Sequence, residues 1–443
     1  MSVLPATFGI ITSFLFVFNK FNFKKIEIRE SLGSIHSKFV GKIAPYLYFR
    51  LMTNFNKVPS AVPDDPSAAV TTVRTANTPA TAVTLSPLPP DFDPAQLQGN
   101  IENYIGMSQV PTGMIGPILV NGRYAQGEFR VPMATTEGAL VASYARGAKA
   151  CTLSGGITAI CMDERVQRCP LFRFENLVQA IDFVQFVGQQ SQLLKGHVRS
   201  VSRHAELLDI EPNIEGNQVI LSFEYKTGDA SGQNMVTICT QHLCEWILVN
   251  MPTPPQFWYI ESNFSGDKKA VVNAFLRTRG KRVSAEVFVP REIVQRVLKS
   301  TPEALERYYE NATLASIQSG AIGINGHYAN GLAAIFIACG QDVACVAEAA
   351  IGINRFEVTP QKVGGDLYFS VTLPNLIVGT VGGGTGLHTQ SQCLAIMDCS
   401  GPGTANKFAE ICAATVLAGE LSIISALAEG HFTQAHKALG RKA

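Results

Sequence analysis

Residues 315–338 read ASIQSGAIGINGHYANGLAAIFIA, a stretch dominated by small and apolar side chains. We expect the chain to be helical from Pro302 onward. So many Gly and Ala residues on one helix indicate either very close backbone packing or a central helix buried on all sides. A second helix is predicted from about Ala405 to Glu429, because Gly430 follows it and Gly is favoured just past a helix C-terminus. The pattern predicts a large, mostly helical domain around a buried helix.

Strand and helix patterns alternate between residues 172 and 275. Residues 219–223 (VILSF) form a strand-like apolar run, and residues 236–248 have apolar side chains at helical spacing. Either an α+β or an α/β module fits this alternation.

The first 98 residues differ in composition from the rest. Residues 3–18 are almost entirely apolar and are followed by basic residues, but this run is shorter than the roughly 20 residues that span a bilayer. It also lacks the flanks of a signal peptide. We expect residues 1–52 to be an anchor-like segment in contact with a membrane. Because positive charge follows the apolar run, the rest of the protein would then lie on the cytosolic side. The alternative is a disordered or buried segment. Residues 53–98, rich in Pro, Ala and Thr, have the composition of a linker.

Composition narrows the function class. Of 443 residues, 16% are charged and 46% hydrophobic, with a net charge of +1, which is typical of a compact enzyme. No stripe of Lys and Arg with interleaved aromatics runs along the sequence, so we expect no nucleic-acid partner. The ten Cys include no C-x-x-C pair, and no His has metal-ligand spacing. We therefore expect reduced thiols and no metal site.

Four short motifs carry side chains suited to polar chemistry at a carbonyl. DKK (267–269) supplies Lys268 for a developing oxyanion, TTEG (135–138) supplies Glu137, and CGQD (339–342) supplies Asp342. His436, near the C-terminus, has the chemistry to protonate a leaving group. Each also has a simpler interpretation: a solvated lysine, a helix-dipole partner, a carboxylate that ends a buried helix, and an exposed terminal histidine.

The TTEG motif also predicts a local structure. Residues 137–150 have small and apolar side chains at helical spacing, and Thr135 or Thr136 has the side chain of an N-cap.

Two glycine-rich turns are candidates for a nucleotide site. GDASGQNM (228–235) follows the strand that ends near Tyr225 and opens a helix, where backbone N–H groups favour phosphate. GTVGGGTG (379–386) is the second. Neither matches the G-x-G-x-x-G fingerprint, and each alone is better explained as a tight turn. Because the chain has two such glycine-rich stretches, a cofactor site and a pair of tight turns explain them equally well.

Taken together, these motifs resemble the catalytic domain of the 3-hydroxy-3-methylglutaryl-coenzyme A reductase family, in its class I, eukaryotic form. The matching segments, in order, are ENYIG (102–106), VPMATTEG (131–138), GDASGQNM (228–235), DKK (267–269), IACGQD (337–342), TVGGGT (380–385), and Gly430-His431 with His436. The resemblance implies an α+β fold in which a small α/β cofactor domain (161–260) is inserted into a large domain (99–160 and 261–443). The N-terminal region resembles a shortened form of the family's membrane region and linker.

The resemblance also implies an activity, the NADPH-dependent reduction of a coenzyme A thioester to an alcohol. In the family two NADPH reduce the thioester to mevalonate, an isoprenoid precursor. Lys268 would stabilise the oxyanion, His436 would protonate the departing thiolate, and Glu137 would supply a proton in the second reduction. Asp342 would bridge Lys268 and Glu137, and Asn330 would orient Glu137 and the substrate.

Further residues are assigned by the same resemblance. The dinucleotide would contact Asp229, Gly232, Gln233, Asn234 and Met235 in the first turn and Gly382 and Gly383 in the second. Arg203 would bind the 2′-phosphate that distinguishes NADPH. Lys269 would contact the acyl group, and coenzyme A would face Ser143, Arg146 and Lys149. The resemblance also implies a homodimer or homotetramer, either associated with the endoplasmic reticulum membrane with a cytosolic catalytic domain, or cytoplasmic.

Three positions depart from the family pattern in the acyl pocket. An Arg appears as Ala159, a Ser as Glu261, and a Lys falls near Glu310. Such changes are expected to repel a glutaryl carboxylate. Two hypotheses therefore remain. The chain reduces 3-hydroxy-3-methylglutaryl-coenzyme A or a related, less anionic acyl thioester. Alternatively, it is a divergent paralogue with an altered substrate or a non-catalytic regulatory role.

Overall fold

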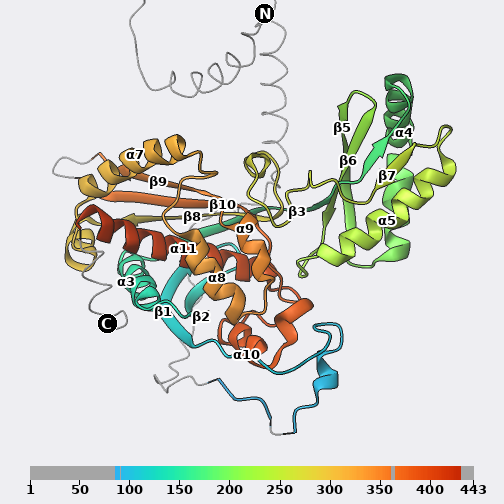
Figure 1. Ribbon diagram of the computed structural model, residues 1–443. Helices are drawn as coiled ribbons and strands as arrows, with labels where there is room; N and C mark the ends of the chain where they lie inside the picture. The colour runs from blue at the N-terminus through green and yellow to red at the C-terminus, as the bar shows by residue number, and fades with distance from the viewer. Residues whose placement is uncertain (1–84, 90, 361–364, 431–443) are drawn as a thin grey trace, which may run out of the picture. The chain divides into compact units, whose positions relative to one another are not determined.

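The computed structural model describes residues 85–89, 91–360 and 365–430 (Figure 1). The chain divides into two units, Met1–Thr81 and Ala82–Ala443, and the described residues all belong to the second. His431, His436, the apolar run 3–18 and most of the predicted linker lie outside the described residues.

The elements follow one another in a mixed order. The strands are β1 (Thr112–Asn121), β2 (Gln126–Ala134), β3 (Thr158–Arg168), β4 (Leu171–Arg173), β5 (Glu206–Glu215), β6 (Gln218–Lys226), β7 (Phe257–Tyr259), β8 (Gly280–Val289), β9 (Ile353–Val358) and β10 (Leu367–Leu376). The longer helices are α3 (Leu140–Leu153), α4 (Leu177–Val201), α5 (Gln233–Asn250), α7 (Pro302–Ser319), α8 (Tyr328–Ala338), α10 (His388–Ile396) and α11 (Ala405–Ala428). The short helices and helical turns are η2 (Pro94–Leu97), η3 (Val272–Phe275), α6 (Arg291–Ile293), η4 (Val294–Leu298), η5 (Val343–Cys345), α9 (Val346–Ala349) and η6 (Gly383–Gly386).

One strand connects the two parts of the sheet. β1 and β2 form a separate hairpin, and the other strands are ordered β7-β4-β6-β3-β8-β10-β9, with β5 beside β6. β3 pairs with β8 up to Arg165 and with β6 from Val166 onward. Every strand pair within the two sheets is antiparallel, which confirms the predicted α+β class. The large part is less purely helical than expected, since it contains β8, β9 and β10.

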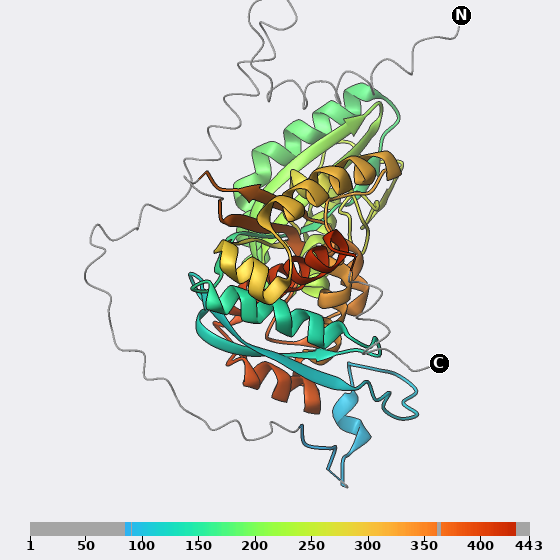
Figure 2. The same ribbon diagram turned by 90° about the vertical axis from the view of Figure 1, so that its left-hand side faces the viewer.

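The central buried helix is α11 (Figures 1 and 2). The predicted helix from Ala405 to about Glu429 is confirmed, and Gly430 follows it with a φ of 69°. α11 is long and apolar enough to cross a membrane, yet 83% of its most apolar window is buried inside the protein. It packs against α3, α8 and the strands β8 and β10. Its apolar character is therefore that of a core helix.

Glycines on α3, α8 and α11 allow these three helices to pack closely. A Cβ on Gly147 of α3 would lie 1.8 Å from the carbonyl oxygen of Ala418 in α11. The ring of Tyr144 fills the space left by Gly331 of α8 and Gly419 of α11, where added Cβ atoms would lie 2.3 and 2.2 Å from it. Within residues 315–338, close backbone approach is found at Gly323, where a Cβ would lie 2.6 Å from the carbonyl oxygen of Gly352, whereas Gly331 of α8 packs against a side-chain ring.

Residues 315–338 are nevertheless not one helix, and this part of the prediction was wrong. α7 ends at Ser319, Gly320 caps it with a φ of 73°, and α8 begins only at Tyr328. Gly323 also has a positive φ, so glycines end the helix as well as allow close packing. The expectation of helix beyond Pro302 also fails at β9 and β10. In β10 buried residues alternate with half-buried ones from Leu367, which is the period of a strand.

The helix expected at Glu137 begins three residues later, at Leu140. The hydroxyl of Thr135 accepts a hydrogen bond from the N–H of Glu137 at 3.0 Å, so it closes a local turn instead of capping α3. The N-cap residue is Ala139, which has a φ of 71° and no side-chain cap. The turn exposes Glu137, which a helical turn would have held closer to α3.

The C-terminal end of the predicted linker contacts the large part of the protein. Leu97 is 5% exposed, and the N–H of Ser86 donates to the side chain of Gln392 in α10 at 2.8 Å.

Candidate active site

Lys268 and Asp342 form an ion pair. Their Nζ and Oδ2 atoms lie 2.8 Å apart, and the two side chains are 45% and 44% exposed. Asp342 lies four residues past the end of α8, and Lys268 lies in the loop between β7 and η3. The hydrogen bond that Lys268 donates to Asp342 is the main reason why the pKa of Lys268 is raised above its usual value. A protonated lysine thus faces solvent at this point.

A buried carboxylate holds the backbone of Lys268. Lys268 has a φ of 56°, a left-handed conformation that is uncommon for a residue with a side chain. Its N–H donates to Glu348 Oε1 at 3.2 Å. Glu348 is fully buried and lies 2.7 Å from Nε of the buried Arg279. This contact is Coulombic only, since neither atom makes a hydrogen bond to a described residue.

Glu348 and Arg279 each help to keep the other ionised in this buried site. Burial is the main cause of a raised pKa at Glu348, which Arg279 opposes. Burial alone would lower the pKa of Arg279, but Glu348 and Asp267 outweigh it, so that its pKa is raised. A buried pair of this kind is costly to break by removing one partner.

Asp267 continues the network toward Arg168, at the end of β3. Its carboxylate lies 2.8 Å from Arg279 and 3.3 Å from Arg168, and these cations overcome the effect of burial and lower its pKa. Arg168 also pairs with Glu261 at 3.0 Å. The sequence interpretation missed Arg168, Arg279 and Glu348. The available signal was a lone carboxylate in the run VAEAA (346–350), since an unpaired Glu is rarely buried.

Glu137 and Asn330 form a second polar pair. Asn330 Nδ2 lies 3.2 Å from Glu137 Oε2 and 3.4 Å from Oε1. Glu137 is exposed, and Asn330 lies in the first turn of α8. The amide of Asn330 thus donates to the carboxylate of Glu137.

The two pairs lie at opposite ends of α8. From Asn330 to the end of the helix at Ala338 the axis rises roughly 12 Å, and Asp342 lies beyond that end. Within the described residues Asp342 pairs with Lys268 and makes no hydrogen bond or ion pair with Glu137. The expected bridge between Lys268 and Glu137 is therefore not formed within one chain.

The two glycine turns lie side by side. The N–H groups of Thr380 and Val381 donate to the carbonyl of Asp229 at 2.8 and 3.2 Å. The carboxylate of Asp229 accepts from the N–H groups of Gly403 and Ala405, at the start of α11. Asp229 therefore fastens the first turn to the second, and its side chain is engaged by the protein.

The glycines of the two turns have different roles. A Cβ on Gly232 would lie 2.3 Å from the side chain of Thr227, so this glycine is needed for packing. At Gly382 and Gly383 an added Cβ would meet nothing within 4 Å, and both have a positive φ. The backbone of the second turn is thus open at Gly382 and Gly383, where no neighbouring side chain covers it.

The first helical residue after the first turn reaches the lysine network. Gln233 contacts the guanidinium of Arg279 through its Oε1 and lies 3.5 Å from Cys345 Sγ through its Nε2. Asn234 is exposed, Met235 is partly buried, and the exposed Arg203 lies in the loop between α4 and β5. Gln233 thereby connects the predicted cofactor site to Lys268.

The residues expected at coenzyme A separate into two groups. Ser143 and Arg146 both contact Ser422 of α11, through Oγ···Oγ at 2.9 Å and through Arg146 Nε and Nη2. Lys149, one turn further along α3, is exposed. Lys269 is also exposed, and its Nζ donates to the carbonyl of Asp267 at 3.0 Å.

The structure shows the surroundings of the three positions that depart from the family pattern, Ala159, Glu261 and Glu310. Ala159 is fully buried on β3, whereas its neighbour Ile160 is 42% exposed, so a polar substrate contact from this strand would come from position 160. Glu261 pairs with Arg168, and its charge is therefore compensated. Glu310 is exposed on α7. The expected repulsion of an acyl carboxylate thus loses its basis at Glu261.

Metal and disulfide chemistry have no visible site in the described part of the chain. No three His, Cys, Asp or Glu side chains gather there as metal ligands. All ten cysteines fall in that part, and each is buried with a free thiol.

Comparison with known proteins gives consistent matches over this fold. The sequence model of the hydroxymethylglutaryl-coenzyme A reductase family matches residues 72–441. A 3-hydroxy-3-methylglutaryl-coenzyme A reductase of Pyrococcus abyssi is 46% identical over 359 residues, which cover 79% of this chain and 87% of that protein. One from Strongylocentrotus purpuratus is 39% identical over 352 residues, covering 77% of this chain and 37% of the relative.

A solved structure shares the fold at lower identity. The class II 3-hydroxy-3-methylglutaryl-CoA reductase of Streptococcus pneumoniae, bound to NADPH in open conformations, aligns with a TM-score of 0.62 and 19% identity. The alignment covers 75% of this chain and 89% of that one.

Proposed function

This chain belongs to the hydroxymethylglutaryl-coenzyme A reductase family, and on that premise we propose that it reduces 3-hydroxy-3-methylglutaryl-coenzyme A to mevalonate with NADPH. The observation that carries the proposal is the ion pair between Lys268 and Asp342, because it places a protonated amine next to Asp342, whose neighbour Gln341 donates to the carbonyl of Gly379 in the second glycine turn. NADPH supplies the hydride in each of the two reductions.

Lys268 stabilises negative charge on the substrate oxygen. Its raised pKa keeps the amine protonated, and its exposed position leaves N–H donors free beside Asp342. A fixed cation is effective because it needs no reorganisation as charge develops. Glu348, Arg279 and Asp267 position the backbone of the lysine without contact to the substrate.

Glu137 donates the proton to the aldehyde oxygen, and Asn330 orients it. Because Glu137 and Lys268 lie beyond opposite ends of α8, one chain does not bring them together. This separation supports a homodimer, or a homotetramer made of such dimers, in which Glu137 of one copy faces Lys268 of another. His436 is the proposed donor to the thiolate, a role that rests on the resemblance alone.

Residues of both glycine turns bind the dinucleotide in this proposal. Gly382 and Gly383 offer open backbone, and Gln233, Asn234 and Met235 are the first residues of α5, directly after the first turn. Arg203 pairs with the 2′-phosphate. Asp229 acts as a positioning residue, since its oxygens are occupied by the backbone around Thr380 and Gly403. The domain limits at 161–260 stay a prediction.

Lys269 binds the acyl carboxylate. It is the one lysine of the DKK motif that makes no ion pair among the described residues, and its Nζ is anchored on the carbonyl of Asp267. The compensation of Glu261 by Arg168 supports an acyl group that is still anionic. Association of residues 3–18 with the endoplasmic reticulum membrane is also part of the proposal, with a cytoplasmic location as the alternative.

The experiment follows NADPH absorbance with the purified full chain and 3-hydroxy-3-methylglutaryl-coenzyme A, beside a Lys268→Ala variant. We expect the wild type to turn over the substrate and kcat to fall by about 10²–10³-fold in the Lys268→Ala variant. Turnover with an uncharged acyl thioester alone would assign a different acyl group. Bound NADPH without turnover of either substrate would favour the non-catalytic paralogue.

A further inference from the structure

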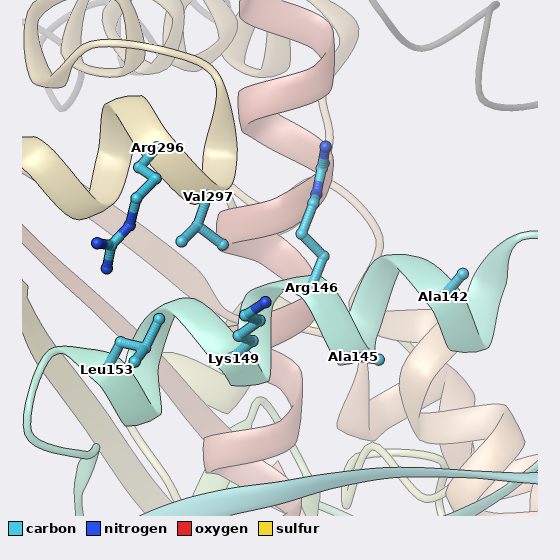
Figure 3. Close-up of a pocket in the computed structure, with 7 residues that line it drawn as sticks. All are labelled: Ala142, Ala145, Arg146, Lys149, Leu153, Arg296 and Val297. Carbon is cyan, nitrogen blue, oxygen red and sulfur yellow. The ribbon is translucent and has the colours of Figure 1, made fainter.

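A buried ion pair contacts the start of the first glycine turn. Lys281 of β8 and Glu164 of β3 are partners across the two antiparallel strands, and Lys281 Nζ lies 3.3 Å from Glu164 Oε2. Their side chains are only 2% and 9% exposed. By contrast, Lys149 and Arg296, which line a pocket between α3 and η4, are both exposed (Figure 3). Because the cost of taking two charges out of water often exceeds their mutual attraction, stability alone is a weak explanation for the pair.

Both members of the pair hold the backbone at the start of this turn. Glu164 Oε1 accepts from the N–H groups of Thr227 and Gly228, at 3.2 and 2.7 Å. Lys281 Nζ donates to the carbonyl of Gly228 at 3.3 Å. The N–H and the carbonyl of Gly228, which has a φ of 63°, are thus both bound by charged side chains. Such charge-assisted hydrogen bonds are stronger than neutral ones.

The rest of the turn is held from the same strand. The side chain of Thr227 packs against Gly232, where an added Cβ would lie 2.3 Å from it. At the far end, Gln233 accepts from the guanidinium of the buried Arg279, which lies two residues before Lys281 in the sequence. Two buried cations at the beginning of β8 therefore contact the two ends of the turn.

We propose that the pair of Glu164 and Lys281 is a positioning device for the dinucleotide, which keeps the first glycine turn in the conformation that binds NADPH. The inference rests on the proposed function, because that function assigns the cofactor to this turn. Both side chains act through the backbone of Thr227 and Gly228. Asp229 fastens the same turn to the second glycine turn, so the pair adds an independent attachment to β3 and β8.

The test uses the double variant Glu164→Gln/Lys281→Met, which removes both charges together and leaves neither of them buried without a partner. Binding of NADPH to the full chain, measured by calorimetry, should weaken about 10-fold or more, because hydrogen bonds to charged groups hold the turn. In steady state, KM for NADPH should rise, while kcat and KM for the thioester stay constant at saturating NADPH. Lys281→Arg, which keeps a cation opposite Glu164, should bind NADPH more tightly than the double variant.

Glu224→Gln is the matched control for a general loss of stability. Glu224 is also buried, on β6, and it forms ion pairs with Arg165 and Arg277. This variant should lower the free energy of unfolding and leave the Kd for NADPH unchanged. Amide hydrogen exchange gives a second readout: the N–H groups of Thr227 and Gly228 should exchange faster in the double variant than in the wild type or in Glu224→Gln.

An equal Kd for NADPH in the wild type and the double variant would overturn the inference. Equal rises in KM for NADPH and for the thioester, or equal weakening by Glu224→Gln, would also overturn it, since either result indicates a general loosening. If the double variant does not fold, Glu164→Gln alone should still weaken NADPH binding although it makes the protein more positive, and an unchanged Kd would again count against the pair. Failure of the wild type itself to bind NADPH would defeat the proposed function and the inference together, and it is seen before any variant is compared.

Discussion

The backbone N–H of Lys268 donates a hydrogen bond to the carboxylate of Glu348, at 3.2 Å. This contact fixes a left-handed residue at the centre of the candidate site, because Glu348 is itself held by the buried Arg279. The backbone of the lysine is thus held by a fully buried carboxylate, while its amine pairs with Asp342.

Glu348→Gln should lower both stability and activity. The amide still accepts from Lys268 but no longer neutralises Arg279, and loss of one partner of a buried pair costs about 3–5 kcal/mol. Denaturant unfolding measures the free energy, and kcat should fall with it. The control is Glu357→Gln, which breaks an exposed pair with Arg355 and should cost less than about 1 kcal/mol. Equal costs for the two variants would show that the buried pair is dispensable.

Asp342→Asn should shift the pH profile. Asp342 raises the pKa of Lys268, so the amide should lower that pKa and move the alkaline limb of kcat to lower pH. The pair adds little stability because both side chains are nearly half exposed. That contribution is present below the ordinary lysine pKa and is lost as the pH rises through the raised value. Asp398→Asn, which removes the partner of Lys407, is the matched control and should leave the profile unchanged.

Gly147→Ala should destabilise the fold. The added Cβ would lie 1.8 Å from the carbonyl oxygen of Ala418, so α3 and α11 would have to separate, at a cost of about 1–3 kcal/mol or more. Gly188→Ala on α4 is the matched change, since its Cβ meets nothing within 4 Å. Replacing this exposed helical glycine by alanine should raise the free energy of unfolding by roughly 0.5–1 kcal/mol. Thermal melts of the two variants should therefore shift in opposite directions; a fall of equal size in both would contradict the packing account.

Local signals in the sequence predict part of this fold. The limits of α11 follow from its apolar run and Gly430, and those of α5 from its helical spacing after the glycine turn. β9 and β10 were missed because Gly-rich and Ala-rich segments around them suggested a continuous helical region. The left-handed Ala139 was also unpredictable, since nothing in its sequence favours a positive φ.

The candidate site also contains residues that the sequence predicted and residues that it did not. Lys268 and Asp342 were predicted from motifs and lie together. The network beneath them joins residues far apart in the chain, which no local pattern reveals. A usable signal was a carboxylate within an otherwise apolar run of sequence. Glu420 of α11 illustrates it, because its buried oxygens accept from the N–H groups of Gly326 and His327.

Mixing inactive chains tests whether the site is shared between copies. Lys268→Ala and Glu137→Gln chains, unfolded and refolded together, should regain about one quarter of wild-type activity, because half of the dimers carry one intact site. Lys268→Ala mixed with Asp342→Asn should show no more activity than the average of the two variants measured separately, since that pair comes from one chain. Recovery in both mixtures, or in neither, would contradict the shared site.

The most direct test of the account is the ratio of NADPH oxidised to coenzyme A thiol released, measured in one reaction with 3-hydroxy-3-methylglutaryl-coenzyme A and the full chain. The account predicts two NADPH for each thiol, with both signals abolished together in Lys268→Ala. Thiol release without NADPH oxidation, or a ratio of one, would contradict a reductase that carries the substrate to the alcohol.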